Sequence, residues 1–121
     1  MTLAISFFEW NEESGENNYC GMPEAPGSEL FGFETWRRKV WGSDSLIEVG
    51  SKFLTQLRDD DLYVNFEELD LFQAELLVIF ERAEDLSSKL ELHIEDLTFR
   101  IKNCMSAVDK AKKDRLGICI S

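Results

Sequence analysis

Three consecutive aspartates, Asp59–Asp61, form the densest group of side chains in this sequence that could do chemistry. Carboxylate oxygens are the ligands that calcium prefers, and residues 59–70 have the length of an EF-hand loop. That loop requires glycine at its sixth position and an oxygen ligand at its fifth, where this chain has Val64 and Tyr63. It also ends in Asp70 instead of a bidentate glutamate. The triplet is therefore predicted to be a solvated turn after a helix, and no metal ion is expected.

The other groups that could act in catalysis are isolated from one another. The one histidine, His93, has no serine or cysteine nucleophile beside it in the sequence, so it does not indicate a catalytic triad. The adjacent carboxylates Glu67 and Glu68 fit the first turn of a helix, where the helix dipole favours negative charge. The chain has no glycine-rich loop between a strand and a helix that would hold a phosphate. We therefore expect a protein that is not an enzyme and that has no cofactor.

Cysteine usage and hydropathy bear on the compartment. The three cysteines are odd in number and lack C-x-x-C spacing, so they are predicted to be buried free thiols of a cytoplasmic protein. They are Cys20, Cys104 and Cys119. No stretch approaches the ~20 apolar residues of a membrane span. The apolar N-terminus, residues 1–8, lacks the basic region of a signal peptide. We expect a cytoplasmic protein of one domain, residues 1–121, with no membrane partner.

The acidic residues are segregated along the chain. Residues 1–36 contain seven glutamates and no lysine or arginine, and residues 59–96 contain thirteen acidic residues against Arg82 and Lys89. The formal net charge of the whole chain is −11. A field of this kind repels nucleic acid and anionic lipid and attracts basic partners. The sequence therefore predicts a basic protein as the partner, and no nucleic acid.

The elements that must position these groups follow from the hydrophobic pattern. Short apolar runs at 2–8 and 118–120 predict two terminal strands that pair with each other. The segment at about 10–33 is polar, acidic and contains glycine and proline, which predicts a long, mobile loop. A short helix is expected at 34–41, with the three basic residues 37–39 facing out.

Two longer helices have the strongest periodic patterns. At 66–86 and 90–112, apolar residues recur at alternating spacings of three and four, which places each set on one helix face. The two sets are Leu69, Phe72, Leu76, Ile79, Ala83 and Leu86, and Leu90, Ile94, Leu97, Ile101, Cys104, Val108 and Ala111. The short link at 86–89 makes the two helices an antiparallel pair.

Capping signatures mark the expected starts of three helices. They are Ser45 with Glu48, Asn65 with Glu68, and Ser88 with Glu91. The first of them predicts a further helix at 46–57. The predicted fold class is α+β: helix-dominated, with an antiparallel helix pair, a further helix, and a small antiparallel sheet from the terminal strands.

Acidic patches and nearby aromatic residues are the candidate partner-binding groups, because aromatic anchors inside a charged rim are typical of interfaces. The predicted residues are Asp59, Asp60 and Asp61 first, and then Trp10, Glu12, Glu13, Glu16 and Tyr19 from the acidic loop. A third patch is Glu81, Glu84 and Asp85 at a predicted helix C-terminus, where the dipole disfavours acids. Reversing the charge of the aspartate triplet is expected to weaken partner binding and to leave the melting temperature unchanged or higher.

Several short segments of residues 34–121 carry a family resemblance. They are Glu34-Thr-Trp36, Trp41-Gly-Ser43, Val49-Gly-Ser51 ahead of Phe53-Leu54, Glu75-Leu76-Leu77, Arg100-Ile-Lys-Asn103 followed by Ala107 and Ala111-Lys112, and Gly117-Ile-Cys-Ile-Ser121. Together they resemble the small acidic immunity proteins of bacterial polymorphic-toxin and contact-dependent growth inhibition systems. The resemblance implies a non-enzymatic inhibitor that binds one cognate toxin domain in the cytoplasm. Such toxins are often basic nucleases.

A second function class fits the same composition. Acidic secretion chaperones and adaptor proteins are also small and α+β, but they are usually dimeric and bind many amphipathic segments. An apolar stripe of seven-residue period serves a dimer as well as an intramolecular helix pair. For the inhibitor we expect a monomer or a weak dimer, so the oligomeric state separates the two classes.

Overall fold

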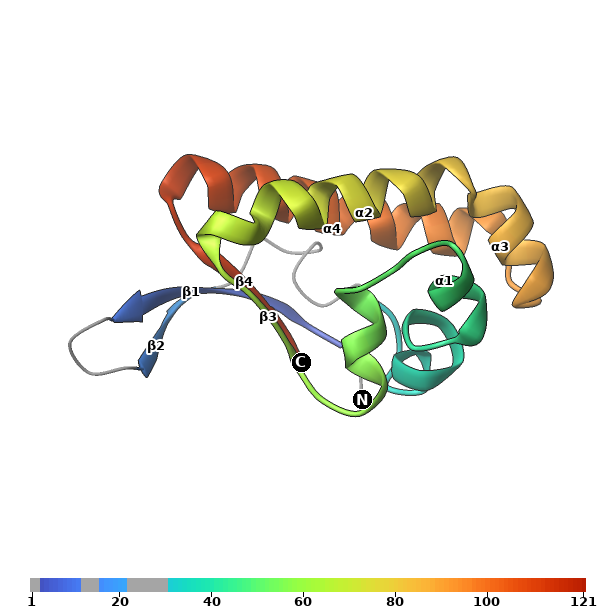
Figure 1. Cartoon of the computed structure of the whole chain (residues 1–121), viewed down its shortest axis with the longest axis horizontal. Helices are drawn as coiled ribbons and strands as arrows, with labels where there is room; N and C mark the ends of the chain where they lie inside the picture. The colour runs from blue at the N-terminus through green and yellow to red at the C-terminus, as the bar shows by residue number, and fades with distance from the viewer. Residues whose placement is uncertain (1–2, 12–15, 22–30) are drawn as a thin grey trace.

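A four-stranded antiparallel sheet joins the two ends of the chain (Figure 1). The computed structural model describes residues 3–11, 16–21 and 31–121, with the backbone alone at 10, 11, 16–18 and 20. The strands are β1 (Ile5–Asn11), β2 (Glu16–Gly21), β3 (Leu62–Val64) and β4 (Gly117–Ile120), in the order β2-β1-β4-β3.

The pairing of the terminal strands β1 and β4 is confirmed. Ile5 lies opposite Ile120, and Phe7 lies opposite Ile118. The prediction of loop throughout about 10–33 is wrong, because β1 continues to Asn11 and β2 pairs with it as a hairpin. Composition did not predict β2 because the segment Glu16–Gly21 lacks the apolar alternation that marks a half-buried strand.

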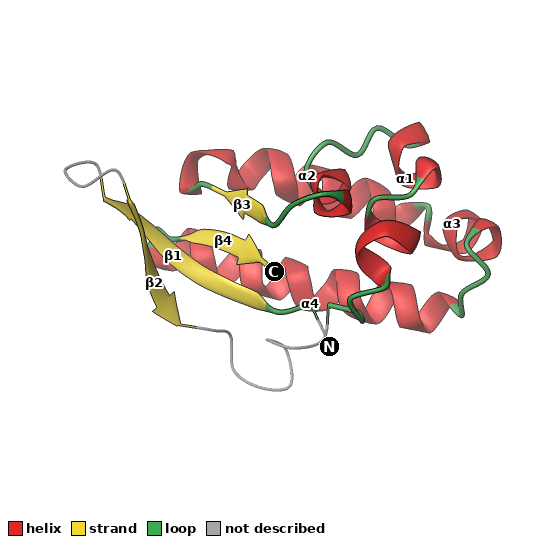
Figure 2. Ribbon diagram, turned by 90° about the horizontal axis from the view of Figure 1, so that it is seen from below, coloured by secondary structure: helices red, strands yellow, loops and turns green. Residues whose placement is uncertain are grey.

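Helices α2 (Leu69–Glu81) and α4 (Ile94–Asp114) form the predicted antiparallel pair, and they cover one face of the sheet (Figure 2). The helix expected at 66–86 is broken at Arg82, and a separate helix, α3 (Ala83–Lys89), continues the chain at a new angle. Arg82 is a good helix former, so local propensity does not predict this break. Helix α3 contacts both α1 and α4 in its new direction.

The predicted link between the paired helices lies too early in the chain. Residues 86–89 are helical, and the turn is made by residues 90–93, with Glu91 in the left-handed region at φ 56°. His93 occupies the N-cap position of α4, so the cap expected at Ser88 is wrong. The capping box at Asn65 and Glu68 is confirmed. It opens a short 3-10 turn, η3 (Phe66–Glu68), that leads into α2.

The single helix expected at 46–57 is wrong. A short helix, α1 (Asp44–Glu48), is followed by an irregular stretch and then by the 3-10 helix η2 (Leu54–Arg58). Ser43, not Ser45, caps α1, because its hydroxyl accepts a hydrogen bond from the Leu46 amide at 3.4 Å. Gly50 then takes φ +93°, a conformation that ends regular helix. The helix predicted at 34–41 is present as one π-helical stretch, η1 (Arg37–Trp41).

The core lies between the sheet and the helices. All six apolar residues of the first stripe are buried. In the second stripe, the residues from Leu97 to Ala111 are buried, but Ile94 is 38% exposed and Leu90 is half-buried, so these two were assigned wrongly. Every second residue of the short strands, including Leu62, Val64 and Ile120, points into the same core. The periodic patterns therefore identify the core faces of both helices and strands.

Candidate partner-binding site

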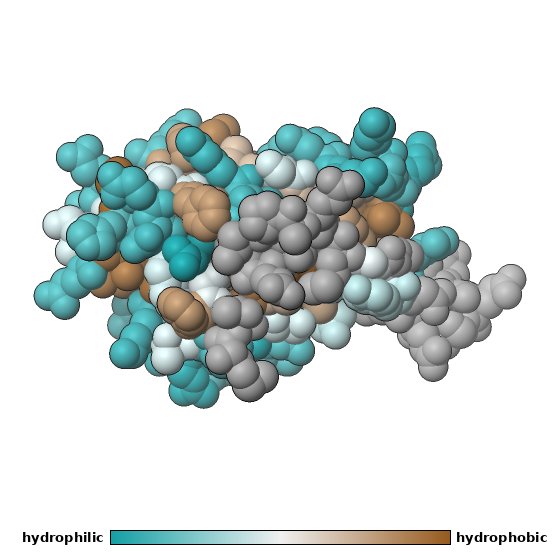
Figure 3. Space-filling model, turned by 180° about the vertical axis from the view of Figure 1, so that it is seen from behind, coloured by the Kyte–Doolittle hydropathy of each residue, from teal (hydrophilic) through white to brown (hydrophobic). Residues whose placement is uncertain are grey.

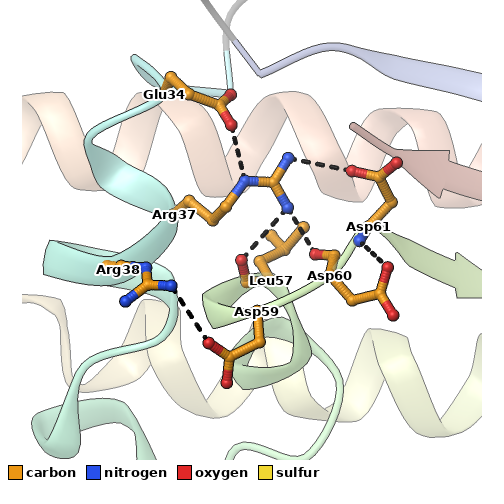
Figure 4. A network of polar contacts seen from close by, with 7 residues as sticks. All are labelled: Glu34, Arg37, Arg38, Leu57, Asp59, Asp60 and Asp61. Carbon is orange, nitrogen blue, oxygen red and sulfur yellow. Dashed lines mark hydrogen bonds and ion pairs between the residues drawn. The ribbon is translucent and has the colours of Figure 1, made fainter.

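The aspartate triplet lies in the turn between η2 and β3, where it meets the basic residues of η1 (Figure 4). The Arg37 guanidinium donates from Nε to Glu34 Oε1 at 2.8 Å and from Nη2 to Asp61 Oδ1 at 3.0 Å. Its Nη1 donates to the backbone oxygens of Leu57, at 3.2 Å, and Asp60. Arg37 is only 16% exposed, so the expectation that it faces out is wrong. It joins η1 to the start of β3.

The three aspartates therefore differ in their surroundings. Asp61 pairs with Arg37, and Asp59 pairs with the exposed Arg38 at 3.4 Å. The exposed carboxylate of Asp60 accepts from the Asp61 amide and, among the residues that the structure describes, has no ion pair.

Charge reversal of the triplet would place lysines beside Arg37 and Arg38 and remove the acceptor of a largely buried guanidinium. The expectation of an unchanged or higher melting temperature is therefore replaced by its opposite, a lower melting temperature.

Tyr63 follows the triplet in β3, and its side chain lies on the face of the sheet that points away from the helices. Its ring meets Phe8 edge-on at 5.7 Å, and Gly117 leaves room for this contact because a Cβ there would lie 2.5 Å from the Phe8 ring. The pKa of Tyr63 is raised, first by the charge of Cys119 and its hydrogen bond, then by burial and by Asp61 and Asp60. The phenol therefore stays protonated, half-exposed beside two carboxylates.

The remaining predicted residues lie elsewhere. Tyr19 is 69% exposed on β2 and shares the outer sheet face with Tyr63. The two tyrosines stand on opposite edge strands, so three strand spacings separate them by roughly 14 Å. The backbones of Trp10 and Glu16 belong to the β1–β2 hairpin. Glu12 and Glu13 lie outside the described residues. The structure thus groups the aspartates with Tyr63 and not with Tyr19.

A groove on α2 was missed by the sequence reasoning. It measures about 490 Å³ and lies between α2 and residues 49–53, with Val49, Phe53, Leu71 and Val78 among its lining residues. Leu71 is 67% exposed and Val78 is 38% exposed. The signal was present in the sequence, because Leu71, Ala74 and Val78 recur at spacings of three and four outside the buried stripe.

Glu75 holds in place the segment 51–54, which forms one wall of this groove. Its carboxylate accepts hydrogen bonds from the Ser51 hydroxyl at 3.0 Å and from the amides of Lys52, Phe53 and Leu54. The distance to each of the last two amides is 2.9 Å. One side chain on α2 thereby satisfies the free amides at the start of η2. This acid is part of the fold and is not free to meet a partner.

Exposed acids also gather at the end of the molecule formed by α3, the right-hand end in Figure 1. There α3 contacts α1 and the start of α4. Among the described side chains, five exposed glutamates of this end have no ion pair. They are Glu48, Glu81, Glu84, Glu91 and Glu95.

The break at Arg82 changes the electrostatics of the third predicted patch. Glu84 and Asp85 lie in the first turn of α3 and not at a helix C-terminus. The helix dipole favours them there, so the predicted dipole penalty is wrong for this pair.

The described residues contain no group of histidine, cysteine or acidic side chains placed to hold a metal ion. Cys104 and Cys119 are buried and free, as predicted, and burial raises the pKa of Cys104 far above its ordinary range. Seen from behind, hydrophilic residues dominate and hydrophobic ones form separate patches (Figure 3). None of the helices in the described part of the chain combines the length and apolar content needed to cross a membrane.

Comparison with protein-family models, curated proteins and solved structures found no match to this chain.

Proposed function

We propose that this protein is an immunity protein that binds and neutralises a cognate toxin domain in the cytoplasm by covering the toxin's active site. The observation that carries the proposal is the group of unpaired glutamates at the α3 end, which includes Glu84 and Glu95. Because none of them forms an ion pair with a described residue, their charge is available to a basic partner, although the exposed Arg82 lies beside Glu81 and Glu84. The resemblance to acidic immunity proteins supports the same class.

The partner that best fits this charge is a basic domain, with a nuclease as the preferred class. A nuclease binds the phosphate backbone of nucleic acid through lysine and arginine. An acidic protein surface whose charge density is close to that of nucleic acid competes for the same site. Electrostatic attraction speeds the encounter, and such pairs associate at up to roughly 10⁸–10⁹ M⁻¹s⁻¹ at low salt. The inhibitor acts as a monomer or weak dimer and needs no cofactor.

The test begins with the reading frame next to the gene. We expect it to encode a toxin whose C-terminal domain stops bacterial growth when expressed alone, and we expect co-expression of this protein to restore growth. A catalytically inactive toxin domain provides the control for expression burden, because it should be harmless with or without the partner. A neighbouring toxin domain that still kills cells in the presence of abundant, folded protein would overturn the proposal.

The alternative is an acidic secretion chaperone or adaptor protein, and the exposed groove on α2 is the observation that favours it. A chaperone would be a stable dimer in light scattering and would bind several unrelated amphipathic segments with similar affinity. A monomer that binds one partner far more tightly than the others would support the immunity protein.

A further inference from the structure

A row of exposed apolar side chains on α2 has one glutamate before its start and one at its end. Leu71, Ala74 and Val78 follow at spacings of three and four residues, so they share one side of the helix. Glu68 lies in the turn just before α2, and Glu81 is its last residue. Glu68 and the three apolar residues line the groove, and Glu81 lies beyond it at the end of α2. At about 1.5 Å per residue, the two glutamates are roughly 20 Å apart.

This row does not serve the core. The buried stripe of α2, which includes Leu69, Phe72 and Leu76, lies on another side of the helix. Leu71 is two-thirds exposed although it faces the groove. A row of exposed apolar side chains beside a hollow is typical of a binding surface.

The opposite wall of the groove is held in place before any partner arrives. Val49 and Phe53 form its apolar part, and the Glu75 carboxylate fixes the backbone of residues 52–54 by three amide hydrogen bonds. The Phe53 ring also packs edge-on against Phe72 of the core at 5.5 Å. A preformed groove requires little ordering on binding, which favours affinity.

The charges around the groove select among possible occupants. Glu68 and Glu81 take part in no ion pair among the described residues, although Glu68 Oε1 also accepts a hydrogen bond from the Asn65 amide. Lys52 is the one cation among the residues that line the groove. A second copy of this chain would bring these glutamates against one another, with a net charge of −11 on each copy. Lysine or arginine on either side of an apolar residue would instead match the pattern of the row.

We propose that this groove binds a cationic amphipathic segment of the partner, with a large apolar side chain seated between Leu71 and Phe53 and basic side chains at Glu68 and Glu81. A groove of this volume holds a few side chains, so it serves as the apolar anchor of a larger, electrostatic interface. The inference rests on the proposed function for the identity of the partner.

The experiment uses the full chain and a fluorescently labelled peptide with leucines along one helix face and lysines at both ends. A second peptide has the same charge and carries serine in place of leucine. We expect Leu71→Ser, which removes the apolar wall, and Ala74→Arg, which fills the groove, to weaken leucine-peptide binding at least about tenfold in anisotropy titrations. The serine peptide should bind weakly to all variants, and Leu71→Ser, which leaves the charge unchanged, should not alter its affinity.

Leu77→Ser is the matched control, because Leu77 is 45% exposed on α2 but does not line the groove. Its affinity for the leucine peptide should stay within about twofold of the original chain. Circular dichroism establishes that each variant is folded, and the two groove variants change the shape of the groove in opposite ways. Unchanged binding by both of them, or equal binding of the two peptides, would overturn the proposal. A dimer that Ala74→Arg dissociates would assign the groove to a second copy and also overturn it.

The peptide assay tests the groove and the growth assay tests the proposed function, so the two hypotheses can be rejected independently. If the groove variants bind the peptide normally while the original chain protects cells from the toxin, this inference is wrong and the proposed function stands. If the peptide binds through the groove but no protection is seen, the groove is a binding site and the proposed function is wrong.

Discussion

Arg37 and Arg38 are neighbours with the same chemistry, but the fold gives them different surroundings. Arg37 is 16% exposed and bonds two carboxylates and two backbone oxygens, whereas the Arg38 side chain is 71% exposed and makes one ion pair. Partial burial acts to lower the pKa of Arg37, but hydrogen bonds and charges of Glu34 and Asp61 outweigh it and raise that pKa. The guanidinium therefore stays charged and holds η1 against the turn before β3.

Removing the two arginines in turn tests this difference. Arg37→Ala leaves two backbone oxygens and two carboxylates without their donor, so it should lower the free energy of unfolding by about 2–3 kcal/mol. Arg38→Ala should change it by less than about 0.5 kcal/mol, since exposed ion pairs contribute little. Urea unfolding of both variants measures the two values. Equal losses would show that the Arg37 contacts do not stabilise the fold.

Glu75 is a second residue whose role depends on contacts with a distant segment, residues 51–54. Glu75→Ala should cost about 2–4 kcal/mol of unfolding free energy, because three amides and a hydroxyl lose their acceptor. Glu81→Ala on the same helix is the control, since Glu81 is exposed and makes no ion pair, and should be nearly neutral. Thermal and urea melts of the pair provide the comparison. Similar melting curves for the two variants would contradict the role assigned to Glu75.

At the scale of elements, the antiparallel pair of α2 and α4 packs fully buried apolar residues of both helices between the pair and the sheet. Leu76 and Ile101 are fully buried, one on each helix, while Leu77 beside Leu76 is 45% exposed. The burial of one leucine and the exposure of its neighbour follow from the helical period.

Shortening the buried side chains of Leu76 and Ile101 tests whether α2 and α4 provide most of the stability of the fold. Leu76→Ala and Ile101→Ala should each cost about 2–4 kcal/mol through lost burial and the cavity left behind. Leu77→Ala should cost less than about 1 kcal/mol. Denaturant unfolding with coincident helix and tryptophan signals gives these values. Losses below about 1 kcal/mol at both buried positions would mean that the stripes contribute little to the core.

At the scale of the whole molecule, folding gathers acids that lie far apart in the sequence. Glu48 ends α1, Glu84 begins α3 and Glu95 begins α4, yet contacts of α3 with α1 and α4 bring these elements to one end. The aspartate triplet, by contrast, is partly neutralised by η1. The α3 end therefore joins the triplet as a candidate surface for a basic toxin.

Charge reversal at the α3 end tests this assignment against the cognate toxin domain. Glu84→Lys with Glu95→Lys should lower the association rate at least about tenfold and change the dissociation rate much less. Raising salt from about 0.1 to about 1 M should slow association of the original chain, because the Debye length falls from about 10 to about 3 Å. Glu9→Lys, an exposed position on β1, is the control. An association rate that depends on neither salt nor these charges would be evidence against steering.

The sequence by itself determined the segments whose burial is periodic. The first stripe, the second stripe from Leu97 to Ala111, the terminal strands and the box at Asn65 and Glu68 are confirmed. Each of these features is recognised from residues that lie close together in the sequence. Spacing of three and four, or of two, specifies a face whatever the face packs against. The excess of acid over base likewise depends on composition alone, and the proposal of a basic partner rests on it.

Only the tertiary structure decided which polar residues are free to act. Arg37 hydrogen-bonds to Asp61, and Ser51 hydrogen-bonds to Glu75. The two residues of each pair are 24 positions apart in the sequence, and no local pattern predicts such pairs. The break at Arg82 and the strand β2 depend on neighbouring elements in the same way. A charged side chain can meet a partner only when the fold leaves it unpaired, and pairing depends on where distant segments meet in space.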